Sequence, residues 1–309
     1  MSVIERGARR RGVRRRVAIA TLAAGLALSS CSTPGVTVKD VSHDCPTAGT
    51  VSGENPWSPG AGWSQVFFDD FDRCSLGDRW SAYSGRPGGN PYSKWDPSMV
   101  TVSDGMLHLY GEKRGKTWVT GGVSNYPITQ LYGRWEVRMR AHPSADLSYH
   151  ALLWPKNEQW PPEIDFAESV ASKRDSIAAF LHWKNKDGEN TKASAWTKDD
   201  FTQWHTIGVQ WAPGVVKYLL DGKVWAEARG TRAVPTTPMW LALQVEAGAC
   251  ERRTDWGMSP CAASEPRPAR TSVDIDWVIV YRPTTDLYKD QNDVARRQPT
   301  PGATQIKVE

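Results

Sequence analysis

The chain has 309 residues and a formal net charge of +4, but the positive charge is not spread along it. Residues 1–30 carry seven arginines and one glutamate, so the remainder holds 31 basic and 33 acidic residues, a formal charge near −2. Because the excess of basic residues belongs to the first segment, the sequence excludes a broad nucleic-acid-binding surface, and we predict no nucleic-acid partner.

The first 30 residues have the composition of an export signal. The arginine-rich head is followed by the uncharged, mostly apolar run 17–28 and then by Leu28-Ser29-Ser30-Cys31. A basic head, a short apolar core and small residues are typical of a cleaved signal peptide. The last four residues resemble a lipobox, in which Cys31 is lipidated, and an ordinary signal peptide with an incidental cysteine is the alternative. We therefore predict residues 1–30 as a signal peptide of an exported lipoprotein. It would be held at the cell-surface membrane only through its lipid, or secreted.

Four further cysteines, Cys45, Cys74, Cys250 and Cys261, are an even number in an exported chain and predict two disulfides. Four cysteines allow three connectivities, and the sequence does not select one. Since Cys250 and Cys261 are close in sequence, we expect them to close one loop, with Cys45–Cys74 tying the N-terminal segment to the body.

The rest of the chain divides by composition. Residues 31–62 are rich in Ser, Thr, Pro and Gly and predict a flexible tether, and residues 286–309 predict a polar tail. Between them, residues 63–285 contain short alternating or apolar runs separated by turn residues, which predict an all-β sandwich of one domain. Such runs include 66–68, 100–102, 106–110, 135–139, 215–220, 239–245 and 273–281.

Residues 163–168 read Glu-Ile-Asp-Phe-Ala-Glu. In a strand, Glu163 and Asp165 would share one face and Ile164 and Phe166 the other. Glu168 joins the first two acids only if a β-bulge adds one residue. Three acids so close are more often a solvated face or a metal-binding loop, but the apolar residues between them favour a half-buried strand. Two carboxyl groups about 5–5.5 Å apart are what retaining glycoside hydrolysis needs, and a third raises the proton affinity of its neighbours.

This acidic motif resembles the catalytic motif of glycoside hydrolase family 16, in the bulged form of its laminarinase-like members. Segments 132–138, 151–155, 204–211, 220–223 and 273–281 resemble the family too, so that the resemblance extends over about residues 64–283. It implies a curved antiparallel jelly-roll β-sandwich, concanavalin-like, with a concave substrate cleft. It also implies Glu163 as nucleophile, Glu168 as acid/base and Asp165 as their assistant, in a reaction without a cofactor. Pro162 departs from the family, whose members usually have Gly there.

Several other side chains are candidates for substrate binding. A hairpin after the acidic strand would place His182 opposite Glu163 and Asp165, although a lone strand histidine is more often structural. Tryptophan rings stack on sugar faces, and Trp154 and Trp160 flank the acids at positions that line the cleft in relatives. Glu136 and Arg138 share a strand face and are either a surface ion pair or, as in relatives, part of the cleft. The remaining candidates are Asn90 and Gln244.

A structural calcium ion is a further implication of the resemblance. Asp70 and Asp276 match the positions that hold calcium on the convex face of relatives. The alternative is that both are ordinary turn or edge carboxylates.

The sequence as a whole predicts a monomeric enzyme whose partner is a polysaccharide. We expect an endo-acting retaining hydrolase of β-1,3 or mixed-linked β-1,3/1,4 glucan. A transglycosylase would use the same residues and differ only in its acceptor. A non-catalytic lectin on the same fold is the alternative outside enzymes, but a lectin has no need of three crowded acids.

Overall fold

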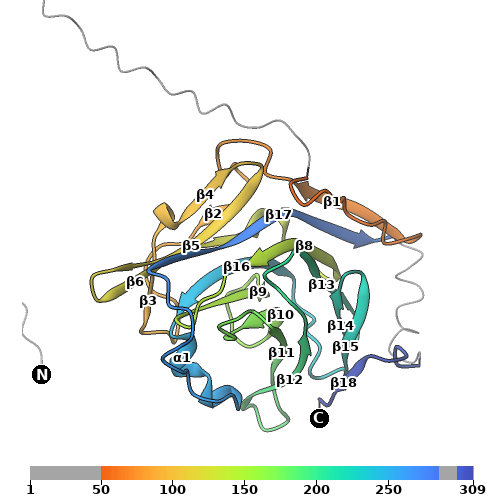
Figure 1. The fold of residues 1–309 in the computed structure, drawn as a ribbon. Helices are drawn as coiled ribbons and strands as arrows, with labels where there is room; N and C mark the ends of the chain where they lie inside the picture. Colours follow the sequence, from red (N-terminus) through yellow and green to blue (C-terminus); the bar gives the residue numbers. More distant parts are fainter. Residues whose placement is uncertain (1–49, 285–297, 309) are drawn as a thin grey trace, which may run out of the picture. The chain divides into compact units, whose positions relative to one another are not determined.

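The computed structural model describes residues 50–284 and 298–308, and Figure 1 shows its strands in two sheets. The larger sheet has 11 strands in these residues. They are β1 (Trp63–Asp69), β3 (Ser93–Trp95), β4 (Val100–Ser103), β5 (Met106–Arg114), β6 (Thr117–Thr120), β8 (Gly133–Ala141), β13 (His205–Ala212), β14 (Val215–Leu220), β15 (Lys223–Arg229), β17 (Arg270–Pro283) and β18 (Thr304–Ile306). Its main path runs β18-β15-β14-β13-β8-β17-β5-β6-β3, with β1 beside β17 and β4 beside β5.

The smaller sheet has seven strands in the order β12-β11-β10-β9-β16-β7-β2. They are β2 (Ser81–Ala82), β7 (Gly122–Ser124), β9 (Leu147–Pro155), β10 (Glu163–Ser169), β11 (Ser176–Lys184), β12 (Asn190–Lys198) and β16 (Met239–Ala247). Helical turns are short: α1 (Ala249–Arg252) and the 3-10 turns η1 (Pro97–Met99), η2 (Tyr126–Ile128) and η3 (Thr254–Trp256). In the described part of the chain, no helix has the length and hydrophobicity needed to span a membrane.

The core lies between the two sheets because alternate residues of each strand point inward. Trp135 and Val137 of β8 are fully buried in it, as are Ile164 of β10 and Leu241 of β16. The other residues of β9, β10 and β16 therefore form the outer face of the seven-stranded sheet. The predicted all-β sandwich is confirmed.

Both ends of the described chain differ from the prediction. The tether was expected to reach residue 62, but the backbone N–H groups of Val51 and Ser52 donate to Asp276, and the Trp277 indole donates to the Glu54 carbonyl at 2.8 Å. The polar tail was expected from residue 286, but Thr304–Ile306 adds β18 parallel to β15 and buries Ile306. Composition failed here because a few anchoring contacts are enough to fix a polar segment.

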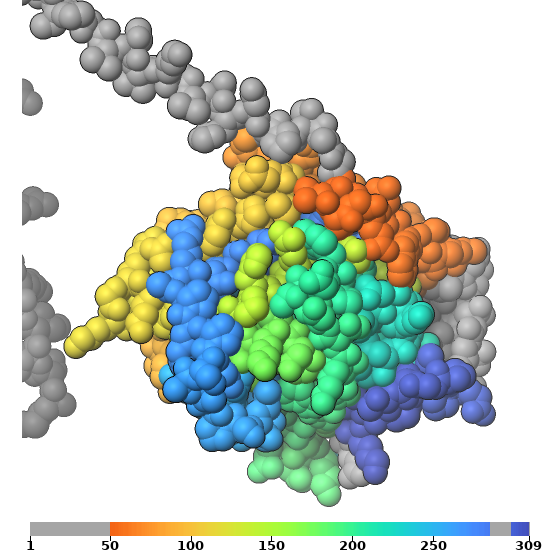
Figure 2. Space-filling model, viewed as in Figure 1, coloured from red at the N-terminus to blue at the C-terminus, as the bar shows by residue number. Residues whose placement is uncertain are grey.

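The space-filling view in Figure 2 shows the blue segment around α1 against the green strands of the smaller sheet. This segment carries the Cys250–Cys261 disulfide, so that predicted pair is confirmed. The Cys45–Cys74 prediction lies outside the described residues because Cys45 does, and so do Cys31 and the predicted signal peptide.

Candidate active site

The acidic strand β10 contains the predicted bulge. Against β9, its register shifts between Asp165 and Ala167, and against β11 between Asp165 and Glu168. Phe166 and Ala167 consequently both face the core and are fully buried. The extra residue returns Glu168 to the face of Glu163 and Asp165, since strict alternation would have sent it into the core.

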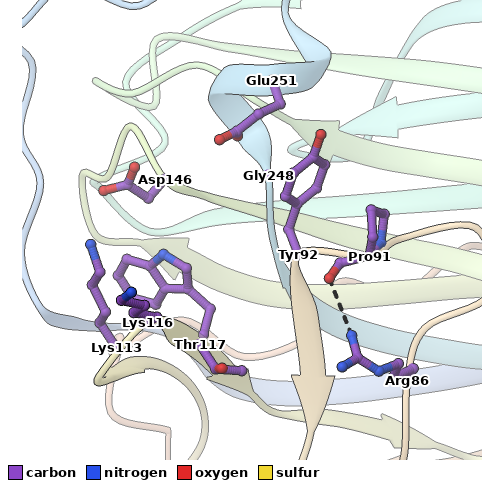
Figure 3. A pocket seen from close by; sticks show the side chains of 10 residues that line it. Arg86, Pro91, Tyr92, Lys113, Lys116, Thr117, Asp146, Gly248 and Glu251 are labelled. Carbon is purple, nitrogen blue, oxygen red and sulfur yellow. Dashed lines mark hydrogen bonds between the residues drawn. The ribbon is translucent and has the colours of Figure 1, made fainter.

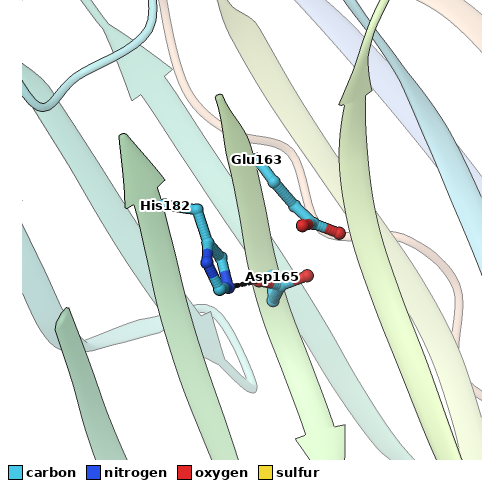
Figure 4. Close-up of side chains that lie close together, drawn as sticks. All are labelled: Glu163, Asp165 and His182. Carbon is cyan, nitrogen blue, oxygen red and sulfur yellow. Dashed lines mark ion pairs between the residues drawn. The ribbon is translucent and has the colours of Figure 1, made fainter. Parts of the chain in front are cut away.

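His182 of β11 lies directly opposite Glu163, as predicted, and its Nε2 is 3.2 Å from Asp165 Oδ2 (Figure 4). Ligand atoms of Glu163, Asp165 and His182 all lie within 4.8 Å of one another. Among the described residues, they are the only group of three or more such side chains this close. Asp165 is only 1% exposed, and its charged neighbours include the carboxylates of Glu163 and Glu168. Because crowded, buried carboxylates favour the protonated form, we assign this group to holding and transferring protons.

Burial is the main reason that the pKa values of Glu163 and Asp165 are raised. It raises the pKa of Glu163 well above its ordinary value, and the charge of Asp165 adds to the effect. Burial, followed by the charge of Glu168, likewise raises the pKa of Asp165. Glu163 has a donor for its negative charge, since the Trp160 indole donates to its Oε2 at 2.7 Å. This hydrogen bond opposes the rise in the pKa of Glu163 and supports its ionised form, whereas Asp165 has no such indole donor among the described residues.

Glu168 has the opposite surroundings. Burial alone would raise its pKa, but His150 outweighs it, with help from Arg252, and the pKa lies below the ordinary value. His150 Nδ1 of β9 is 2.6 Å from Glu168 Oε1. His150 was missed in the sequence because it stands in an apolar strand, with no mark that it would pair with residue 168. Only the bulge brings the two side chains to the same face.

Both predicted tryptophans lie beside the acids. Trp160 is 41% exposed and its ring centroid is 5.7 Å from that of His182. Trp154 is on the same strand face as His150, packs with Trp240 and Leu152, and donates to Glu158 at 2.9 Å. Flat aromatic surfaces next to a carboxylate cluster can hold a sugar ring by stacking.

Gln244 and Asn90 join this face through Glu246. Gln244 of β16 is opposite His150, and its amide donates to Glu246 Oε1 at 3.2 Å. The Asn90 amide donates to Glu246 Oε2 at 2.6 Å and to the Ala247 carbonyl at 2.9 Å. Asn90 is buried, so its contacts in this structure are with Glu246 and the backbone.

The prediction that Glu136 and Arg138 line the cleft is wrong. Trp135 and Val137 of β8 fill the core, so Glu136 and Arg138 point to the outer face of the other sheet. Glu136 accepts from Arg134 at 2.7 Å, and Arg138 contacts Glu54. Alternation in the sequence identified a shared face but could not say to which sheet it belonged.

Asp276, one of the two residues proposed for calcium, has surroundings that do not fit that ion. Asp276 accepts from the backbone N–H of Val51 at 2.7 Å and of Ser52 at 3.1 Å, and from the Ser52 hydroxyl. Calcium takes six to eight oxygen ligands, whereas these neighbours point hydrogens at both carboxylate oxygens. Asp70 accepts from the Asp72 backbone, at 3.4 Å.

A pocket of about 350 Å³ lies next to α1 and is lined by cationic, acidic and aromatic side chains (Figure 3). Lys113 and Arg86 contribute positive charge, while Asp146 and Glu251 contribute negative charge. None of the three motif acids lines it, so it is separate from the carboxylate site.

Comparison with known proteins gives one family. The sequence profile described as "Glycosyl hydrolases family 16" matches residues 90–278. A β-glucanase of Acetivibrio thermocellus is 32% identical over 148 residues, 47% of this chain and 43% of that protein. An endo-1,3-1,4-β-glycanase of Rhizobium meliloti is 26% identical over 195 residues, 62% of this chain and 41% of that protein. The chain thus spans less than half the length of these two relatives.

The fold has solved counterparts. The X-ray structure of an endo-β-1,3-glucanase from Pyrococcus furiosus superposes with a TM-score of 0.59 at 19% identity. The match covers 72% of this chain and 95% of that one. This likeness confirms the predicted jelly-roll sandwich.

Proposed function

Because the chain belongs to glycosyl hydrolase family 16, we propose that it is a retaining, endo-acting β-glucan hydrolase. Its substrate is a β-1,3 or mixed-linked β-1,3/1,4 glucan. The observation that supports the proposal most is the bulge in β10, which places Glu163, Asp165 and Glu168 on one face. The β-glucanase and the endo-1,3-1,4-β-glycanase named above support the substrate class.

The reaction proceeds by double displacement. Glu163 attacks the anomeric carbon while Glu168 protonates the departing glycosidic oxygen, which gives a glycosyl-enzyme. Water then attacks the same carbon, gives its proton to Glu168 and releases Glu163. Asp165 keeps its own proton and so lowers the repulsion that a third charge would add.

The aromatic side chains near the acids would hold the glucan chain. Trp154, Trp240 and Tyr126 lie to one side, with Tyr126 edge-on to Trp240 at 6.1 Å between ring centroids. Trp160 lies next to Glu163, where it can stack on a sugar and still donate to the nucleophile. A site with aromatic surface on several strands suits an internal stretch of polymer.

Incubation with a panel of β-glucans and galactans tests the proposal. We expect a rapid fall in the size of a β-1,3 or mixed-linked glucan, with products of several lengths and initial retention of the β anomer by NMR. Binding without products over a long incubation would instead indicate a lectin. Products longer than the substrate, suppressed by competing acceptors, would indicate a transglycosylase.

We also propose that the protein is exported and lipid-anchored through Cys31, on the sequence pattern alone. Expression of the full chain with Cys31→Ser should move the protein from the membrane fraction to the soluble exported fraction. An unchanged distribution would contradict the anchor.

A further inference from the structure

His150 and Glu168 form an ion pair on the outer face of the smaller sheet. The Nδ1–Oε1 distance is 2.6 Å, and His150 is only 5% exposed. The proposed reaction requires Glu168 to deliver a proton, yet its surroundings favour the ionised form. The question is therefore where that proton is kept in the free enzyme.

The hydrogen bonds around Ser148 bear on which nitrogen atoms of His150 carry a proton. The Ser148 hydroxyl donates its one proton to the Glu246 carbonyl at 3.2 Å and accepts from Arg252 Nη2 at 2.6 Å. It also lies 2.9 Å from His150 Nε2. Arg252 can only donate, the Glu246 carbonyl can only accept and the hydroxyl has a single proton, so all three contacts are hydrogen bonds only when Nε2 is the donor. In that arrangement His150 carries a proton on Nε2 in either state of the pair, and the proton between Nδ1 and Oε1 is a second one.

We propose that His150 and Glu168 share one transferable proton, so that His150 is the positioning residue that lets Glu168 act as the acid near neutral pH. This inference rests on the proposed function. In the free enzyme the proton resides mainly on His150 Nδ1, and the minor form, neutral His150 with protonated Glu168, is the one that reacts. A proton can move across so short a contact without rearrangement of either side chain.

The charges that face the pair support this distribution. Burial lowers the pKa of His150, but the charge and hydrogen bond of Glu168 outweigh it, and Glu246 of β16 adds to the rise. Arg252 of α1 opposes the rise at His150 and favours the ionised form of Glu168. On the other side of Glu168, the charge of Glu163 opposes its ionisation, while His182 favours it. The net result keeps the proton on the imidazole.

The proton balance is complete over both steps. During glycosylation the C1–O bond to the leaving group breaks, Glu163 bonds to C1, and the shared proton goes to the leaving oxygen. The pair is left as neutral His150, still protonated on Nε2, and ionised Glu168. During hydrolysis a proton of the attacking water returns to the pair as its oxygen bonds to C1 and Glu163 leaves.

The pH dependence of kcat/KM tests the sharing. The pair becomes inactive only after both sites have lost the proton, so its apparent pKa exceeds that of Glu168 beside a neutral partner. His150→Asn keeps an N–H donor near the Nδ1 position but cannot hold a transferable proton. We expect its alkaline limb to move about one pH unit or more to lower pH, roughly a tenfold loss on that side, with activity kept at acid pH.

Two outcomes decide the activity test. His142→Gln is the matched control, because His142 Nε2 is 3.0 Å from Asp274 Oδ2 on the other sheet and the pair plays no part in the site. Its alkaline limb should equal that of the wild type. If His150→Asn also keeps the wild-type limb, His150 merely holds Glu168 in place and the sharing is refuted.

An NMR titration of the His150 imidazole separates this inference from the proposed function, because it needs no substrate. We expect His150 to lose its proton at higher pH in the wild type than in Glu168→Gln, by at least one pH unit. Equal midpoints in the two proteins would overturn the inference, even if the enzyme were active. If no polysaccharide is cleaved but the midpoints differ, only the proposed function fails.

Discussion

Two buried aspartates on opposite sheets show how the same side chain can serve different purposes. Asp274 of β17 is 3% exposed and accepts from His108, His142, Arg140 and Ser272 at 2.8–3.0 Å. Asp165 of β10 is 1% exposed, and it lies near one histidine, His182, and two carboxylates, Glu163 and Glu168. Burial raises the pKa of both, but at Asp274 the hydrogen bonds outweigh it and the net shift is downward.

The difference shows which buried charge stabilises the fold. Asp274 has partners that compensate its desolvation, whereas Asp165 is left to hold a proton or repel its neighbours. A sequence that tolerates the second arrangement loses stability to keep it, which is typical of functional sites. The contrast can be tested through activity, stability and pH.

The largest effect is expected when the acids of β10 are replaced by amides. Glu163→Gln and Glu168→Gln should each lower kcat by about a thousandfold or more, since one removes the nucleophile and the other the acid. Asp165→Asn should leave a trace of activity, because Asn still fills the site between them. Assays on a β-glucan at equal concentrations of folded protein measure this, and normal turnover by either Gln variant would refute the assignment.

Asp274→Asn should show the reverse pattern. It breaks a buried, fully partnered charge, for which we expect a loss of about 3 kcal/mol in the free energy of unfolding. Activity per folded molecule should stay at the wild-type level because Asp274 lies on the other sheet. Urea titration followed by tryptophan fluorescence gives the first quantity. An Asp274→Asn variant as stable as the wild type would mean that the hydrogen bonds of Asp274 do not compensate the cost of burying its charge.

The two aspartates should also respond to pH with opposite signs. The pKa of Asp165 is raised in the folded state, so its folded form loses stability as the pH rises above about 4, the ordinary value of the unfolded chain. Asp165→Asn should therefore be more stable than the wild type by about 1–2 kcal/mol at pH 8, and the gain should vanish near pH 4. Unfolding experiments at several pH values measure this gain.

The lowered pKa of Asp274 has the mirror-image consequence. Its contribution to stability is present above about pH 4 and is lost as the pH falls towards the folded value. The deficit of Asp274→Asn should thus shrink in acid, where the gain of Asp165→Asn is already gone. If both differences changed with pH in the same direction, the contrast between the aspartates would be wrong.

Local patterns in the sequence predicted the acidic strand, its bulge and the histidine opposite it. Alternation of Glu163, Ile164 and Asp165 gave the strand and its faces, and the position of Glu168 required the bulge that β10 contains. His182 followed from the length of the hairpin. These features depend on neighbours in the chain, where periodicity is reliable.

Features that depend on distant segments could not be predicted in this way. The role of His150 depends on its contacts with Glu168 and Ser148 and on the nearby Arg252. Only the order of β16, β9 and β10 in the sheet brings these side chains together. The prediction for Glu136 and Arg138 was wrong for the same reason. The sequence shows which residues share a strand face, but it does not show to which sheet the strand belongs. The docked residues 51–57 needed Asp276, more than 200 positions away.

The loss of the Trp160 indole should give the smallest effect of these substitutions. The indole is a neutral donor to Glu163 on the smaller sheet. On the larger sheet, by contrast, Asp274 has a cationic partner, Arg140. Trp160→Phe keeps the aromatic surface but removes one hydrogen bond to Glu163, worth about 1 kcal/mol, so kcat should fall about fivefold with little change in KM. Trp154→Phe is the matched control, because its indole donates to Glu158, outside the catalytic acids. An equal fall in kcat for both variants would mean that stacking on the sugar, and not support of the Glu163 charge, is what the two tryptophans share.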